Sequence, residues 1–90
     1  MAEQERHEQA IKHYEQALAI CKRLGLLRLQ GSFSFKLGLS LAALKRPEAT
    51  IAAFEEARDC FQQTSAAQQL ARVEQLFVHI REARKEASAE

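Results

Sequence analysis

Histidine and cysteine are the residue types in this sequence that most readily bind metals or act as nucleophiles. The histidines are His7, His13 and His79, and the cysteines are Cys21 and Cys60. A zinc site needs three or four protein ligands, at short spacings in structural sites, whereas His7 and His13 would point to different faces of a helix. The pattern predicts surface histidines, cysteines that behave as small buried apolar residues, and no metal ion or other cofactor.

Catalytic groups are equally sparse. Glu55 and Glu56 are adjacent, so they are expected on an exposed helix face, where two carboxylates do not converge on one substrate. The glycines form no phosphate-binding pattern, and no serine lies in a nucleophile motif. We therefore do not expect an enzyme.

Charge and hydropathy narrow the class of partner. The 90 residues include 13 Lys and Arg against 12 Asp and Glu, which gives a net charge of +1. Nucleic acids and membrane surfaces are usually bound by a concentrated positive field, and no apolar run approaches the ~20 residues that span a bilayer. Residues 1–9 are polar and acidic, unlike a secretory signal. These features predict a cytoplasmic protein with neither nucleic acid nor membrane as partner.

Strong helix formers dominate, with one proline and three glycines, which predicts an all-α fold. Apolar residues at three- and four-residue steps predict about four helices, the first three over 3–24, 27–44 and 47–63. Thr64 or Ser65 is expected to cap the start of the fourth helix. Helix 27–44 is apolar on more than one side, which is typical of a helix that lies mid-domain or contacts a partner.

Two segments of the chain share one pattern, since residues 10–17 and 50–57 both place a small residue, isoleucine, an aromatic and alanine at the same offsets. Between them lies Leu37-Gly38-x-x-Leu41, where glycine would let two helices touch. This order resembles the tetratricopeptide repeat. The family's usual period is about 34 residues, and the period of about 40 residues in this chain is similar to the long-period variant of cell-polarity adaptor scaffolds.

The resemblance implies a right-handed array of antiparallel helix hairpins. In the single domain 1–90, residues 1–25 would be the second half of a repeat, 27–63 one full repeat and 65–87 a capping helix. Leu37, Gly38 and Leu41 match the first helix of a repeat, and Thr50, Phe54 and Ala57 match the second. Two departures are Ser34, where an aromatic residue is expected, and the missing closing proline. A four-helix bundle without repeat ancestry remains the alternative fold.

In that family the first helix of each repeat lines a concave groove. The resemblance therefore implies six partner-binding positions: Ser32, Phe35, Lys36, Leu39, Ala42 and Ala43. Relatives that clamp a C-terminal carboxylate have lysine and asparagine at two of these positions, whereas Phe35 and Leu39 stand there in this chain. The expected groove is apolar, with Lys36 as one basic neighbour.

The functional expectation is an adaptor that binds a peptide or a protein subunit through helix 27–44. The alternative is structural: a homo-oligomer, for example a helix-exchanged homodimer, in which that helix is interface core. Phe35 and Leu39 could equally be plain core beneath the first or the last helix. These alternatives remain open from the sequence.

Overall fold

The computed structural model describes the backbone of residues 2–89 and the side chains of residues 3–83. Four α-helices make up this part of the chain: α1 (Ala2–Leu24), α2 (Leu27–Ala43), α3 (Pro47–Gln63) and α4 (Ala67–Ala89). Residues 2–89 contain no β-strand, so the predicted all-α fold is confirmed. Met1 and Glu90, which the predicted domain 1–90 includes, lie outside the described residues. No helix in the described range is long and apolar enough to cross a membrane.

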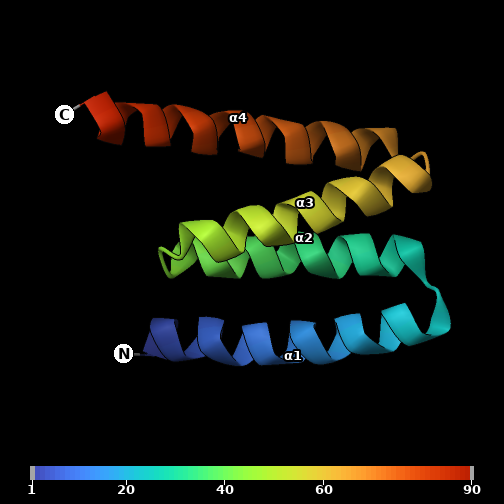
Figure 1. Cartoon of the computed structure of the whole chain (residues 1–90). Helices are drawn as coiled ribbons and strands as arrows, with labels where there is room; N and C mark the ends of the chain where they lie inside the picture. The colour runs from blue at the N-terminus through green and yellow to red at the C-terminus, as the bar shows by residue number, and fades with distance from the viewer. Residues whose placement is uncertain (1, 90) are drawn as a thin grey trace.

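Each helix runs antiparallel to the next (Figure 1). Helix α2 packs against both α1 and α3, while α4 packs against α3. As a result α1 and α4 lie at opposite edges of the molecule, and α2 and α4 run in the same direction (Figure 1). The arrangement is flat, with principal extents of 45 × 33 × 17 Å.

Three turns of the same geometry join the helices. In each turn, one residue shortly after the end of the preceding helix adopts the left-handed conformation. These residues are equally spaced along the chain: Gly25 (φ 69°), Lys45 (φ 58°) and Ser65 (φ 57°). The next residue donates its amide hydrogen to the carbonyl five positions back: Leu26 to Cys21 (2.9 Å), Arg46 to Leu41 (3.1 Å) and Ala66 to Phe61 (3.0 Å). This is the Schellman motif, which satisfies helix-terminal carbonyls. Two turn intervals make up one helix hairpin. This length equals the offset between residues 10–17 and residues 50–57 in the sequence.

The expected cap of the fourth helix is wrong. Helix α4 begins at Ala67, and Thr64 belongs to the end of α3, because its Oγ1 donates a hydrogen bond to the Cys60 carbonyl at 2.9 Å. Ser65 occupies the left-handed turn position. A hydroxyl side chain can satisfy carbonyls at a helix end as well as amides at a helix start. In this chain the Thr64 hydroxyl bonds to a carbonyl of the preceding helix, α3.

The core lies mainly between α3 and its two neighbours. Phe54, Ala57 and Phe61 of α3 pack with Val73 and Phe77 of α4. A second buried cluster joins three helices through Ile11, Leu41 and Ala53. Apolar residues of the predicted helix 47–63 thus face the core at three- and four-residue steps, and Ile51 packs against the first cluster as a partly buried residue.

Glycine sets the distance between α2 and α3. A Cβ atom placed on Gly31 would lie 2.6 Å from Cε1 of Phe61, and one on Gly38 would overlap the ring of Phe54. Because only glycine leaves room for these rings, the two helices are in close contact at both positions. The expectation that Gly38 lets two helices touch is confirmed.

Candidate functional site

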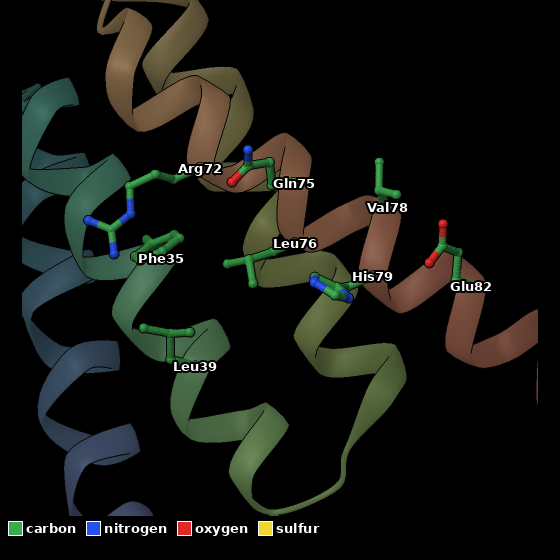
Figure 2. A pocket seen from close by; sticks show the side chains of 8 residues that line it. All are labelled: Phe35, Leu39, Arg72, Gln75, Leu76, Val78, His79 and Glu82. Atoms are coloured by element: carbon green, nitrogen blue, oxygen red, sulfur yellow. The ribbon is translucent and has the colours of Figure 1, made fainter.

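A groove runs between α2 and α4, which are separated because α4 packs on α3 instead. Two adjoining hollows of ≈ 670 and ≈ 310 Å³ share Phe35, Leu39 and Arg72 and together form what we call the α2–α4 groove. Its α2 wall consists of Ser32, Phe35, Lys36 and Leu39, its α4 wall of Gln69, Arg72, Gln75, Leu76, Val78, His79 and Glu82, and Phe61 lies at its base. Figure 2 shows the two walls facing each other, with Phe35 and Leu39 on one and Leu76 on the other.

Phe35 belongs to both the core and the groove. Its ring centroid lies 5.7 Å from that of Phe54, which is almost completely buried. The Cζ atom of Arg72 lies 5.5 Å from the centroid of the same Phe35 ring. The ring is therefore half-buried and held in place, and it presents only part of its surface to a ligand.

Leu39, one helical turn further along α2, is the open apolar residue of the α2 wall. The Leu39 side chain is 44% exposed, and it lines the hollow. On the opposite wall Leu76 is partly buried against the core cluster. An apolar side chain placed between Leu39 and Leu76 would remove both from water, and fully burying one leucine-sized side chain contributes about 1.5–3 kcal/mol.

Charge is unevenly distributed along the groove. Lys36 and Arg72 lie near the end marked by Ser32 and Gln69, where none of the lining residues is acidic. Lys36 Nζ lies 5.7 Å from the centroid of the Phe33 ring, so both cations rest against aromatic faces. The other end carries His79 and Glu82.

The six positions named from the sequence do not share one site. Ser32, Phe35, Lys36 and Leu39 line the α2–α4 groove. Ala42 lines a separate shallow hollow with the α2–α3 turn and Ile80, and Ala43 lines another with the N-terminal part of α1. Successive residues of a helix point in directions about 100° apart, so the last two positions face different sides of α2.

The α4 wall was not expected as part of the site, since residues 65–87 were interpreted as a cap. Arg72, Gln75 and His79 lie on the polar side of α4, and nothing in their types points to a groove. Val78 is the one signal, because it widens the apolar stripe of α4 beyond Leu76, which packs against the core cluster. Sequence periodicity does not give the angle between helices that brings this wall opposite α2.

The opposite face of α2 carries a polar link between α1 and α3. Ser34, which is fully buried, donates a hydrogen bond to Oε2 of Glu56 at 2.6 Å. Oε1 of the same carboxylate lies 3.2 Å from Nζ of Lys22. The expectation of an exposed face is thus correct for Glu55 and wrong for Glu56, which is half-buried against Ser34.

The cysteines are buried and unpaired, as the sequence predicts for small apolar residues. Burial raises the pKa of the Cys60 thiol, and the nearby carboxylates of Glu56 and Asp59 raise it further. Such a thiol is a poor nucleophile at neutral pH. Among the described residues, no group of three histidine, cysteine or acidic side chains could hold a metal ion.

Comparisons with known proteins give no neighbour: no family model, no curated protein and no solved structure matches this chain.

Proposed function

We propose that this protein is a non-catalytic interaction module of tetratricopeptide-repeat type that binds a peptide of a partner protein in the α2–α4 groove. The observation that carries the proposal is the pairing of Leu39, exposed on α2, with Leu76 across a hollow formed by two parallel helices. Apolar patches rimmed by polar residues on a small protein commonly mark interaction sites.

The repeat geometry supports the assignment to this class. Left-handed turn residues recur at equal intervals, at positions 25, 45 and 65, so a shift of two intervals relates α1 to α3 and α2 to α4. Gly38 against Phe54 provides the close helix contact within the central hairpin. In such an array, helices of the α2 and α4 type line one common face, where the groove is found.

The role of α4 as a cap follows from the same shift. The residues of α2 that face α3 are mainly small or apolar and are mostly buried: Gly31, Ser34, Phe35, Gly38 and Leu41. Their equivalents on α4 are all exposed and mostly polar: Ala71, Glu74, Gln75, Val78 and Arg81. A terminal repeat helix needs such a polar outer face. We therefore assign α4 two roles, cap and second groove wall.

A cytoplasmic setting forms part of the proposal. Cys21 and Cys60 are both unpaired and buried, which suits a reducing compartment. The proposal does not include nucleic-acid or membrane binding, because Lys36 and Arg72 are too few for the concentrated positive field that such partners need. It does not include catalysis, because the groove presents mainly apolar side chains.

Selection from a random-peptide display library on the immobilised protein tests the proposal. We expect enriched peptides that shift the amide resonances of α2 and α4 around Phe35, Leu39 and Leu76, with little effect on α1. If no peptide is enriched, or if the shifts lie on α1 instead, the groove is not a peptide-binding site.

A second candidate is self-association, favoured by the end of the molecule near the α1–α2 turn. Four large apolar side chains there are exposed: Ile20, Leu24, Leu26 and Leu29. A homo-oligomer would cover them. Light scattering over a range of concentrations would then give a mass above that of one chain, and Leu24→Glu would return it to one chain. A concentration-independent monomer would exclude this candidate.

A further inference from the structure

We infer that the groove selects an acidic peptide, one that carries Asp or Glu next to its apolar anchor. This inference rests on the proposed function, and it adds the chemistry of the partner. It is based on charge complementarity at the Ser32–Gln69 end of the groove, where the lining residues include Lys36 and Arg72 and no acidic side chain.

Neither cation is neutralised within the part of the chain that the structure describes. Among those side chains the ion pairs are Lys22–Glu56 and Arg46–Glu8, and neither involves Lys36 or Arg72. The first turns of α2 and α4, which lie at this end, also contain no acidic residue. Two such cations beside an apolar hollow would attract an anionic group and repel a cationic one.

Arg72 is held in a suitable position to receive a carboxylate. Its Cζ lies 5.5 Å from the centroid of the Phe35 ring, and Figure 2 shows the guanidinium reaching from α4 towards that ring. Contact with an aromatic face leaves the N–H groups in the guanidinium plane free to donate to the two oxygens of a carboxylate. Because Phe35 is itself fixed against Phe54, little freedom is lost when the bond forms.

The groove also has a direction. Glu82 lies at the opposite end, ten positions beyond Arg72 on α4, a separation of roughly 15 Å along the helix. An extended peptide covers that distance in about four or five residues. The acidic residue of the peptide is therefore placed beside Arg72 and Lys36, its apolar anchor near Leu39, and a neutral or basic residue near Glu82.

The test uses three fluorescein-labelled peptides with the same apolar anchor, which carry Glu, Gln or Lys on the side of the anchor placed beside Arg72 and Lys36 and Gln on the side placed near Glu82. All have amidated C-termini, so that no terminal carboxylate contributes. We expect the Glu peptide to bind at least roughly tenfold tighter than the Lys peptide, with a preference that shrinks as salt is added.

Matched variants separate the charge effect from the groove itself. Lys36→Gln with Arg72→Gln should weaken the Glu peptide by roughly tenfold more than it weakens the Gln peptide. The control, Lys12→Gln with Arg81→Gln, removes the same charge from exposed positions outside the groove and should change neither.

The outcomes distinguish this inference from the function on which it rests. Equal affinity for the Glu and Gln peptides, with both lost in Leu39→Glu, would overturn the acidic preference and keep the groove as a binding site. Equal weakening of the Glu peptide in the control variant would show a general charge effect and would also overturn the preference. Absence of binding by all three peptides would contradict both proposals.

Discussion

Arg72 of α4 and Phe35 of α2 are in contact across the groove, with the arginine Cζ 5.5 Å from the phenylalanine ring centroid. The same ring packs on Phe54 in the core, 5.7 Å between centroids. Thus Phe35 links the core to the groove, and its neighbour Leu39 extends into the groove without such support. The sequence left open whether these two residues belong to the groove or to the core. Phe35 belongs to both, and Leu39 belongs to the groove.

The first prediction follows from this difference. Phe35→Ala should lower the free energy of unfolding by about 2–4 kcal/mol, because it removes a half-buried ring packed on Phe54. Leu39→Ala should cost less than about 1 kcal/mol, since much of that side chain is already in water. Urea denaturation followed by circular dichroism measures both. Equal losses would mean that Leu39 is covered in solution.

Gly38→Ala tests the close contact of α2 and α3. Although alanine favours a helix by about 1 kcal/mol, its Cβ would overlap the ring of Phe54, which is buried in the core. We expect a net loss of about 1–3 kcal/mol from overpacking. A variant as stable as the natural chain in the same denaturation experiment would show that the two helices are further apart.

Lys45→Gly addresses the repeated turn. Lys45 has φ 58°, a conformation that costs a residue with a Cβ about 1–2 kcal/mol and costs glycine little. Glycine also loses more backbone entropy on folding, so we expect a net gain of up to about 1 kcal/mol, seen as a higher Tm by calorimetry. Gly25→Ala, at the equivalent position with φ 69°, is the matched opposite and should lower Tm. A lower Tm for Lys45→Gly would contradict the turn geometry.

The environment of Cys60 should make the stability of the fold depend on pH. Burial and two neighbouring carboxylates raise the pKa of its thiol in the folded protein, so the neutral thiol is favoured there. Its contribution to stability is therefore complete below the ordinary thiol pKa and is lost as the pH rises through the folded value. Stability should fall less steeply over that range in Cys60→Ala than in the natural chain. In a Cys21→Ala background, alkylation of the native protein at neutral pH should be slow; fast alkylation would contradict burial.

Local signals in the sequence predicted the helix bounds well where a residue type fits only one position at a helix end. The predicted bounds 3–24 and 47–63 agree with α1 and α3, where Gly25 lies in the turn after α1 and Pro47 begins α3. The signals failed at Thr64 and Ser65, since the same polar residues can end one helix or begin the next. Lys45 also gave no sign of its left-handed conformation, because lysine, unlike glycine, does not favour positive φ.

The groove was only half predictable. Phe35, Lys36 and Leu39 follow from the resemblance to the first helix of a repeat. Arg72 and Leu76 reach the site because α4 packs on α3, where the ring centroids of Phe54 and Phe77 lie 6.1 Å apart. The position of α4 depends on side-chain packing between distant segments, and periodicity along one helix does not predict it.

The most direct test of the account is the affinity of a library-selected peptide for Leu39→Glu compared with Leu29→Glu, measured by fluorescence anisotropy. Both leucines lie on α2 and are similarly exposed, 44% and 49%, but only Leu39 lines the groove. We predict that Leu39→Glu weakens binding by roughly tenfold or more, while Leu29→Glu stays within about twofold of the natural chain. Equal affinities for the two variants would contradict the assignment of the α2–α4 groove as the binding site.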